Sequence, residues 1–451
     1  GAPEPGPGMT VLAGPSRPAP TVPVPAMPRL LLHMMFDRTR AMSEMAHRYG
    51  DVVRIPLGRN QLHFFNHPRH AKHVLTENAA NYIKGIGQVH AKKALGDGLL
   101  TAEGETWRRQ RSNLKPAFAA KRLPMQADVV TAATRRWIAE LSRDRAKPMD
   151  LRERLTELTL QIVGPALMGT DLTAFAGIGA AFEAVQDQAM LEMLTFNRLP
   201  DWAPVPTRLR FRKAQLELDE VVTTLLGQPA IDAEPDSVLA LLNDDSAPAE
   251  VRLRVRDELV TMLLAGHETT ATLMTWVFVL LDQHPAAFEA VREEAVRVLA
   301  EGEPDASTVV RLPYTGAVLK EALRLYPPVW LLPRRALADD VIDGHFVPAG
   351  SDVLLCPYTL HRHPAFWSDP EAFRPERFLG QGEPGDRYAY LPFGAGPRVC
   401  IGSALGTLEA TLAVAMISAS YRLRVRTPSI GNQAMMTLRV RHGLPVTVEP
   451  V

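Results

Sequence analysis

Apolar residues recur every three or four positions along most of this 451-residue chain, which is the period of a helix buried on one face. The longest predicted helix covers residues 249–282 and would extend for roughly 50 Å at 1.5 Å per residue. Pro285 follows it and would stop it. Shorter helices are predicted over residues 37–49, 68–77, 106–119, 126–142, 151–167, 175–196, 208–226, 237–243 and 286–299. The fold class is therefore expected to be mainly α.

Alternating apolar and polar residues, which are typical of strands, occur in a few short regions. The run VVRIPL (residues 52–57) is followed by HFFN, which suggests an early hairpin. Residues 337–356 are expected to form two strands around a turn. Residues 435–450 are expected to form a late hairpin that turns at His442 and Gly443. These strands predict small peripheral β-sheets on a large helical body.

The first 28 residues are rich in proline and glycine, and we expect a disordered tail over residues 1–28. Residues 1–8, which precede Met9, resemble the remnant of an expression tag. From residue 29 onward the composition shows no break, and no Ser/Gly-rich linker interrupts the chain. A single domain is therefore expected over residues 29–451.

Charge and cysteine usage exclude several classes of protein. Fifty basic and fifty acidic residues cancel, so nothing points to nucleic acid as a partner. Cys356 and Cys400 could form one disulfide at most, which favours a cytoplasmic location. Residues 259–281 are long and apolar enough to cross a membrane, but Glu268 lies at their middle, where charge is costly. We therefore expect a buried helix and no membrane anchor.

The stretch LPFGAGPRVCIG, residues 391–402, surrounds Cys400 with glycines and leads into a helical pattern. Glycines allow backbone N–H groups to converge on a sulfur atom, and a helix N-terminus adds positive potential. Both effects favour a thiolate and lower the pKa of a thiol. Most single cysteines are inert core residues, and Cys356, within an apolar strand pattern, fits that description.

FGAGPRVCIG resembles the haem-binding loop of the cytochrome P450 family, whose pattern is F-x-x-G-x-R-x-C-x-G. Further family motifs follow the family order: WRRQR, AGHETT, KEALR and FRPERF. They cover the chain from about residue 40 to its end. The resemblance implies a triangular helical prism around a buried haem, in the branch with arginine at this loop position. The matching loop positions are Phe393, Gly396, Arg398, Cys400 and Gly402.

The resemblance also implies a cofactor, haem b (iron protoporphyrin IX), with the Cys400 thiolate as the axial iron ligand that favours O–O cleavage. Phe393 would cover the sulfur, and Gly402 belongs to the same cofactor-binding loop. Trp107 and Arg111 lie one helical turn apart and share a face. The haem propionates would be held by charge-assisted hydrogen bonds. The residues assigned to them are Trp107, Arg111, Arg334 and Arg398.

The cluster His267-Glu268-Thr269 interrupts an apolar segment. It begins the zinc pattern H-E-x-x-H, but Ala271 occupies the second histidine position. The resemblance implies instead that Ala265 and its neighbour Gly266 loosen the helix where oxygen must fit. The catalytic pair would be Thr269, which offers a hydroxyl, and Glu268, which supplies protons. Alternatively, the threonine only bonds the carbonyl four residues earlier. His267 is expected to point away from the haem face.

The motif residues Glu321 and Arg324, with Arg377 of FRPERF, stand among apolar residues. The family pattern implies a buried structural charge network that holds the core near the haem loop. Alternatively, Glu321 and Arg324 form a surface pair three residues apart, which contributes well under ~1 kcal/mol. The appearance of FRPERF before the cysteine loop favours the network.

The expected reaction inserts one oxygen atom from O2 into a small hydrophobic compound, by hydroxylation or epoxidation, with two electrons from a separate partner. A ferredoxin with its reductase, or a flavodoxin-like protein, would supply them to a monomer. Basic residues after Trp107 could steer an acidic partner, or could equally be a solvated helix face. These residues are Arg108, Arg109, Lys115 and Lys121.

By resemblance, the substrate pocket is formed by residues 86–100, 190–196 and 264–269 and by two later segments. Their walls are mostly apolar and rich in methionine, without a charged anchor, which suits a terpenoid, polyketide or fatty-acyl compound. The pocket residues predicted in the later segments are Val329, Trp330, Leu331, Met435 and Met436. The alternatives are a non-catalytic haem sensor and a peroxide-driven peroxygenase, neither of which explains the Glu268-Thr269 pair.

Overall fold

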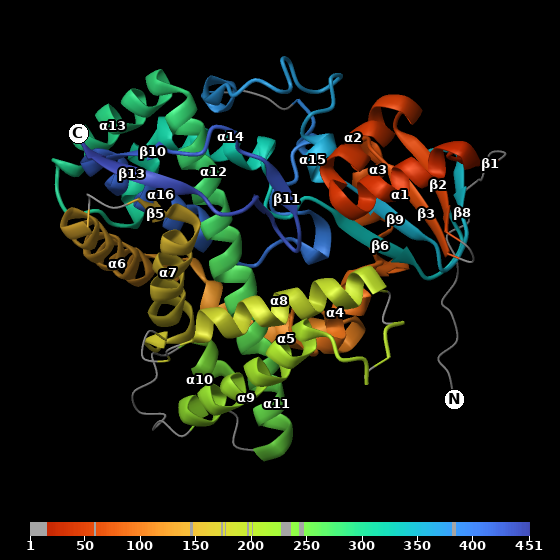
Figure 1. Ribbon diagram of the computed structural model, residues 1–451, viewed down its shortest axis with the longest axis horizontal. Helices are drawn as coiled ribbons and strands as arrows, with labels where there is room; N and C mark the ends of the chain where they lie inside the picture. Colours follow the sequence, from red (N-terminus) through yellow and green to blue (C-terminus); the bar gives the residue numbers. More distant parts are fainter. Residues whose placement is uncertain are drawn as a thin grey trace.

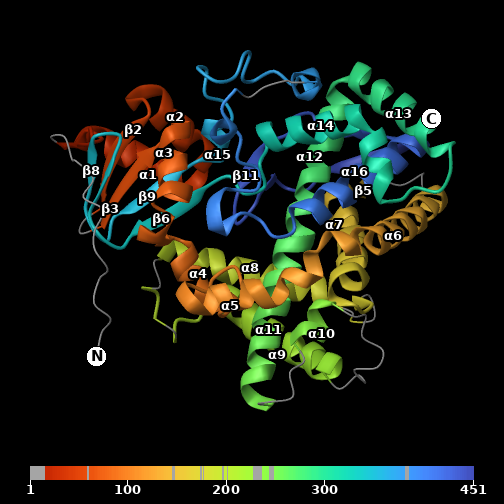
Figure 2. The same cartoon turned by 180° about the vertical axis from the view of Figure 1, so that it is seen from behind.

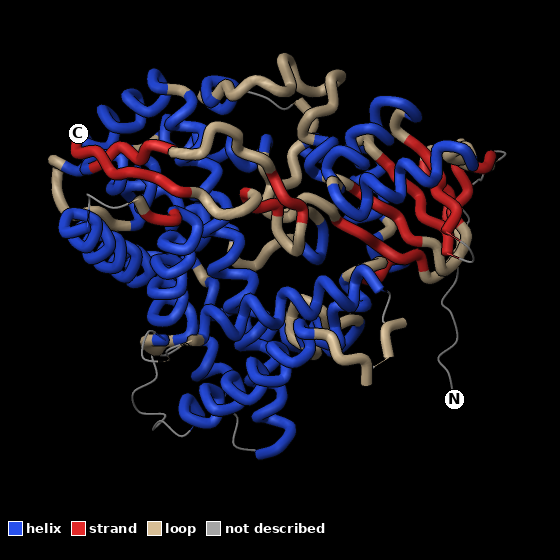
Figure 3. Tube along the Cα trace, in the orientation of Figure 1, coloured by secondary structure: helices blue, strands red, loops and turns tan. Residues whose placement is uncertain are grey.

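A computed structural model describes residues 16–57, 60–144, 148–172, 175, 177–195, 198–200, 202–226, 236–242, 248–380 and 385–451. The predicted tag remnant and Phe196, the last residue of one predicted pocket segment, lie outside the described residues. Helices make up most of the structure, as predicted, and most of the strands lie toward two opposite sides of it, with one short strand pair between them (Figures 1 and 3).

The helices follow most of the predicted segments. They are α1 (Met27–Phe36), α2 (Arg38–Tyr49), α3 (Pro68–Lys72), α4 (Gln88–Leu95), α5 (Gly104–Leu114), α6 (Leu123–Asp144), α7 (Leu151–Val163), α8 (Ile178–Thr195), α9 (Pro206–Leu226), α10 (Val238–Leu242), α11 (Pro248–Leu263), α12 (Thr269–Gln283), α13 (Pro285–Leu299), α14 (Pro313–Leu325), α15 (Pro357–Leu360) and α16 (Ser403–Ser420). Helix α14 and the short helices α1, α4 and α15 were not predicted.

The long central helix is present but is not uniform. A π-helical turn, η9 (Leu264–Glu268), joins α11 to α12, and the three together run through the middle of the molecule (Figures 1 and 2). Every residue of α12 from Thr270 to Leu281 is buried. A π-turn widens a helix locally and is frequent at functional sites. Here it lies where Ala265 and Gly266 were predicted to loosen the helix.

The largest sheet has the strand order β2-β3-β9-β6-β4. Its strands are β2 (Val52–Leu57), β3 (Asn60–Phe65), β4 (Tyr82–Lys84), β6 (Leu332–Ala336) and β9 (Asp352–Leu355). The early hairpin is thus confirmed as β2 and β3, which pair antiparallel. Phe64 and Phe65 of β3 are both buried but belong to different core clusters, because successive side chains point to opposite faces.

The two later strand regions differ from prediction. Residues 337–356 contain three strands: β7 (Asp340–Ile342) and β8 (His345–Val347) form a hairpin, and β9 joins the large sheet instead. The chain turns at His442 and Gly443, both with positive φ, but the flanking strands do not pair with each other. β12 (Leu438–Val440) pairs with β11 (Asn432–Ala434), whereas β13 (Pro445–Pro450) pairs with β10 (Tyr421–Val425) and β5 (Met149–Asp150).

The late hairpin was predicted wrongly because distant partners bind its two strands. A Cβ atom at Gly443 would lie 2.1 Å from a carboxylate oxygen of Asp150, so β13 leaves the turn pressed against β5. Leu151 donates its backbone N–H to Leu444 O. Sequence alternation identifies a strand but does not identify which distant strand it pairs with.

Part of the segment predicted as a disordered tail forms regular structure. Within the proposed tail of residues 1–28, β1 (Arg17–Pro18) pairs in parallel with β8, and Thr21 bridges to Arg54. Val22 is buried. Arg17 and Pro18 therefore form a short edge strand, a position that tolerates proline because no N–H is needed on the outer side. The end of the segment is helical, with a 3-10 turn at Val24–Ala26 and the start of α1 at Met27. Residues 1–15 lie outside the described part of the chain.

Glu321, Arg324 and Arg377 form a network in the core. Arg324 donates two hydrogen bonds to the Glu321 carboxylate, at 2.8 Å from Nε and 2.7 Å from Nη2, and Arg377 Nε donates to Glu321 Oε1 at 3.1 Å. The side chains of Glu321 and Arg324 have no exposed surface. Arg324 also donates to the carbonyls of Pro370 and Ala372. Loss of one member of such a buried set costs about 3–5 kcal/mol, because the remaining charge loses its partner.

α16 passes the length and composition test for a membrane-spanning helix among the described helices. Its mean hydropathy is 1.3, and 67% of it is buried inside the protein. It packs against α6, α12, α13 and α14, and most of its buried apolar side chains belong to the largest core cluster. Its apolar character is therefore explained by these contacts within the protein.

Two carboxylates near the C-terminal end of α11 hold the loop that precedes α5. Asp257 Oδ2 accepts from the backbone N–H of Asp97 at 2.8 Å, and Glu258 Oε2 accepts from that of Leu99 at 3.0 Å. A Cβ atom at Gly96 would lie 2.1 Å from Asp257 Oδ1. The other oxygen of Glu258 is buried without a partner. Burial raises the pKa of Glu258 to about 7.

This carboxyl makes stability depend on pH. The pKa of Glu258 is higher in the folded protein than in the unfolded chain, so its protonated form favours folding below pH 4.5, and the benefit is lost as pH rises toward 7. The full effect is about 3 kcal/mol. We expect Glu258→Gln, which keeps the acceptor for Leu99, to remove this part of the pH dependence in denaturation experiments at pH 5 and pH 8. Glu220→Gln, on an exposed face of α9, should leave it unchanged; equal slopes for wild type and Glu258→Gln would contradict the assignment.

Candidate active site

The Cys400 loop is held by close backbone contacts. Cys400 donates its backbone N–H to Phe393 O at 2.9 Å. Gly396 has φ +70°, and a Cβ atom there would lie 1.7 Å from Leu75 O. Only glycine fits this position, because both the conformation and the space exclude a side chain. The loop ends at Gly402, the N-cap of α16, so the cysteine lies directly before a long helix.

Cys400 is exposed although most of α16 behind it is buried. The Gly402 backbone N–H and the nearby Arg111 stabilise a thiolate, but desolvation outweighs both and raises the pKa of Cys400. The lowered pKa predicted from the glycines and the helix end is therefore wrong for the protein alone. A bound metal cation reverses this balance, since a coordinating thiol is deprotonated outright.

The Cys400 loop forms one wall of the candidate site, and the π-turn η9 with the following Thr269 forms a second wall. Ala265 is exposed within a stretch of buried residues, and Thr269 is half-buried one turn further along. The Thr269 hydroxyl donates to Ala265 O, which is the back-bonding alternative considered for this residue. Its oxygen can still accept a hydrogen bond. The two walls are neighbours, because a Cβ atom at Gly406 of α16 would lie 3.7 Å from Thr270 Oγ1.

Three cations and one acid meet beside the cysteine loop. Lys84 on β4 stands directly opposite Arg334 on β6, and both lie within electrostatic range of Arg398 and Glu103. Arg398 pairs with Glu103, and its Nη1 is buried without a hydrogen-bond partner. Burial, reinforced by the nearby Arg398, lowers the pKa of Arg334 to about 10. Like charges opposed across strands are destabilising, so this cluster requires anionic ligands.

The indole of Trp107 connects this cluster to the cysteine. The guanidinium carbon of Arg398 lies 4.1 Å from the Trp107 ring centroid, and that of Arg111 lies 5.8 Å away. Arg111 Nη2 donates to Val399 O at 2.9 Å. The structure thus brings together Trp107, Arg111, Arg334 and Arg398, as the sequence predicted. Lys84 and Glu103 were missed, because only the β4–β6 register and the start of α5 place them there.

These residues fit a haem. Beside one acid lie an orphaned buried guanidinium nitrogen of Arg398 and the side chains of Arg334 and Lys84, whose pKa values burial lowers. Bound carboxylates would favour the charged forms of these side chains. An exposed thiol lies on the same side, and the helix opposite presents an alanine rather than a large side chain. The arrangement can hold a cofactor that is anionic at its edge and ligated by a thiolate at its centre.

The predicted substrate-pocket residues differ in burial. Val329 and Leu331 are half-buried, but Trp330 between them is buried, because an extended chain alternates its side chains. The Trp330 Nε1–H donates to Met435 O at 2.9 Å, and Cys356 Sγ donates to Trp330 O at 3.2 Å. Trp330 therefore packs within a core cluster, and its place in the substrate pocket stays a prediction.

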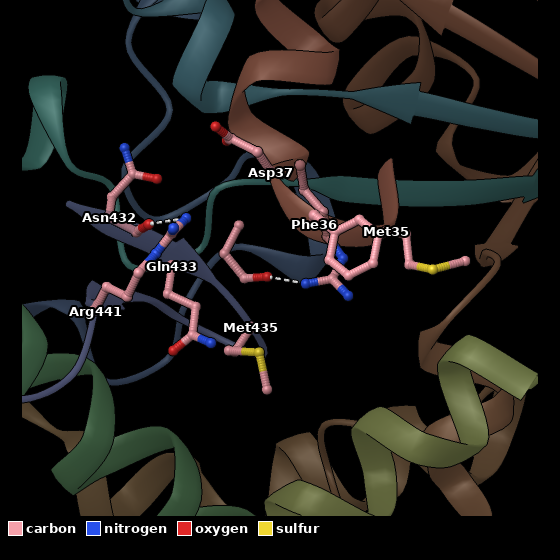
Figure 4. Close-up of a pocket in the computed structure, with 9 residues that line it drawn as sticks. Met35, Phe36, Asp37, Asn432, Gln433, Met435 and Arg441 are labelled. Carbon is pink, nitrogen blue, oxygen red and sulfur yellow. Dashed lines mark hydrogen bonds between the residues drawn. The ribbon is translucent and has the colours of Figure 1, made fainter. Parts of the chain in front are cut away.

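The two methionines also differ from each other. Met436 packs against the helical cluster that contains α8 and α11. Met435 lines a separate pocket of about 180 Å³ with Met35 and Phe36 at the end of α1 (Figure 4). The expectation of walls without a carboxylate is also incomplete. Glu192, in the predicted pocket segment 190–196, is buried and accepts from Gln188 on the same helix.

Glu268 and His267 point in different directions. Glu268 Oε1 accepts from Thr437 Oγ1 at 3.0 Å. His267 Nδ1 bonds Leu263 O within its own helix, and its ring centroid lies 5.7 Å from that of Phe182 on α8. His267 therefore faces α8, and of the two only Glu268 connects the π-turn to the hairpin of β11 and β12.

Comparisons with known proteins agree with this site. The family model "Cytochrome P450" matches residues 18–437. Cyclooctatin synthase of Streptomyces melanosporofaciens is 33% identical over 83% of each chain. Cyclooctat-9-en-7-ol 5-monooxygenase of the same organism is 31% identical over 91% of each chain. Putative cytochrome P450 132 of Mycobacterium tuberculosis is 30% identical over 88% of this chain and 90% of that protein.

The chain belongs to the cytochrome P450 family. It is accordingly a cytochrome P450 monooxygenase, and the family implies a haem-thiolate cofactor. The fold, with its central helix and small sheets, is that of the family.

We propose Cys400 as the thiolate ligand. Cys400→His should abolish the strongly red-shifted Soret band of the reduced carbon monoxide complex, because an imidazole does not donate electron density as a thiolate does. Cys356→Ala is the matched control: burial raises the pKa of Cys356 to about 11, and this buried thiol should be dispensable. A normal band in Cys400→His, or its loss in Cys356→Ala alone, would contradict the assignment.

Proposed function

We propose that this monooxygenase inserts one atom of O2 into a neutral lipophilic compound, using two electrons from a separate redox protein. The observation that carries the proposal is the pairing of two walls: a thiol beside an unneutralised cation cluster, and a π-turn with Ala265, Glu268 and Thr269. The reaction consumes O2, two electrons and two protons and yields a hydroxylated or epoxidised product and water.

Each residue has one task in this proposal. Haem, when bound, supplies the iron at which O2 is activated. Cys400 is placed to ligate the iron, and Arg334 and Arg398 are placed to hold carboxylates by charge-assisted hydrogen bonds. The Thr269 oxygen can accept a hydrogen bond while the hydroxyl donates its own hydrogen bond to Ala265 O. The Glu268 carboxyl donates a proton and is reprotonated from solvent.

The proposed substrate is a neutral, largely apolar compound of terpenoid, polyketide or fatty-acyl type. Val329, Leu331 and Met436 offer apolar surface, and the buried carboxylate of Glu192 is already satisfied by Gln188. The name of one relative, cyclooctat-9-en-7-ol 5-monooxygenase, describes an unsaturated alcohol oxidised at a further carbon. Among terpenoid, polyketide and fatty-acyl compounds, this name favours an alicyclic hydrocarbon or alcohol as the substrate.

The proposed electron donor is an acidic ferredoxin, supplied by its reductase, or a flavodoxin-like protein. α5 and the turns after it expose Arg108, Arg109, Lys115 and Lys121. Arg108 and Lys121 also contact Glu105 and Asp236, so the net field there is weaker than four cations alone would give. Steering by such a surface raises association rates and is weakened by salt. In this proposal the protein acts as a monomer in the cytoplasm.

Ligand titration tests the substrate class. A neutral alicyclic alcohol should displace water from the ferric iron and shift the Soret band to shorter wavelength, whereas its carboxylate or quaternary-ammonium analogue should not. With NAD(P)H, a ferredoxin and 18O2, the product should contain one 18O atom. Leu331→Ala should change the position of oxidation, while Trp330→Phe should mainly lower stability. Binding of charged analogues alone would overturn the substrate class and leave the cofactor assignment intact.

A further inference from the structure

Glu268 makes one hydrogen bond among the described residues, and its donor comes from a distant part of the sequence. Thr437 Oγ1 donates to Glu268 Oε1 at 3.0 Å, and both residues are buried. The other carboxylate oxygen, Oε2, has no such bond and is not among the fully buried polar atoms without a partner. One oxygen is therefore fixed, and the other has access to open space.

The segment that carries Thr437 is attached firmly to the central helix. Trp276 Nε1 donates to Leu438 O at 2.7 Å. Trp276 lies two turns after Glu268 on the same face of the helix. The adjacent hairpin residues Thr437 and Leu438 therefore each form a hydrogen bond to this face, two helical turns apart. The Trp276 indole stacks on Tyr326 with ring centroids 3.8 Å apart. Thr437 cannot move away from Glu268 without disturbing these contacts.

Charged groups around Glu268 do not decide which way its carboxylate turns. Arg439, two residues beyond Thr437, lies within electrostatic range of Glu268, but also of Glu183 and Asp187 on α8 and of Arg152 on α7. Arg152 pairs with Glu183, and Arg210 pairs with Asp187. His267 on the same turn bonds Leu263 O. The charges are shared among several partners, whereas the Thr437 hydroxyl is directed at one oxygen.

We propose that Thr437 is a positioning residue for proton delivery: its hydroxyl fixes Glu268 Oε1 so that Oε2 remains free to pass protons into the site. This inference rests on the proposed function of Glu268. Without the hydroxyl, the carboxylate can turn toward Arg439, and protons then reach the site more slowly. The electrons delivered meanwhile reduce O2 to hydrogen peroxide or water instead of supporting product formation.

Thr437→Val and Thr437→Ser test the inference in the haem-loaded enzyme. Thr437→Val is nearly isosteric and should lower product formed per NAD(P)H consumed by about threefold to tenfold, the range that corresponds to the net contribution of one typical hydrogen bond. Haem content and KM should be unchanged. Thr437→Ser should restore coupling, because it restores the donor. Thr275→Val, which removes a buried hydroxyl bonded to Ala271 O on the same helix, should have no effect on coupling.

Combining Thr437→Val with a substitution of Glu268 distinguishes a failure of the role proposed for Thr437 from a failure of the role proposed for Glu268. Thr437→Val should cause no further loss of coupling in the Glu268→Gln background. In the denaturation midpoint of the haem-free protein, Thr437→Val and Glu268→Ala should be non-additive, because Glu268→Ala removes the acceptor of the Thr437 hydroxyl. Equal losses in both backgrounds, or full coupling in Thr437→Val, would overturn the role of Thr437. Full coupling in Glu268→Gln alone would instead overturn the role assigned to Glu268 under the proposed function.

Discussion

The site depends on positive charge that the protein does not neutralise by itself. Lys84 and Arg334 oppose each other across β4 and β6, Arg398 approaches them from the cysteine loop, and Glu103 is the one acid among them. Such a cluster costs free energy until anions enter it. The strand register, the start of α5 and the loop before α16 must all be in place to form it. The cofactor that supplies those anions therefore also stabilises the fold around it.

The rest of the architecture keeps this cluster and the thiol in fixed positions. The buried network of Glu321, Arg324 and Arg377 ties α14 to the segment before the cysteine loop through carbonyls at Pro370 and Ala372. Gly396 lets that loop press against Leu75 O. On the other side, the π-turn gives up regular helical hydrogen bonding to present Ala265. Rigid support on one wall and a local distortion on the other together create the reaction space.

The sequence predicted those features that depend on local spacing. The helical period located most helices, and the residues around Cys400 identified the loop and its neighbours Arg398 and Phe393. Features that depend on distant pairing were not predictable. Lys84 reaches the site only through the β4–β6 register, Thr437 only through a hairpin whose partner strand was predicted wrongly, and Glu258 only through the loop before α5.

The retention of haem tests the central claim most directly. The measurement is the rate at which the ferric protein transfers haem to an excess of an apo-globin acceptor. Arg334→Leu should accelerate transfer by at least about tenfold, since a hydrogen bond to a charged group contributes about 1.5–3 kcal/mol. Arg335→Lys, which changes the next residue of β6 and keeps the charge that pairs with Asp352, should lose haem at the wild-type rate. Equal rates for wild type and Arg334→Leu would contradict the account.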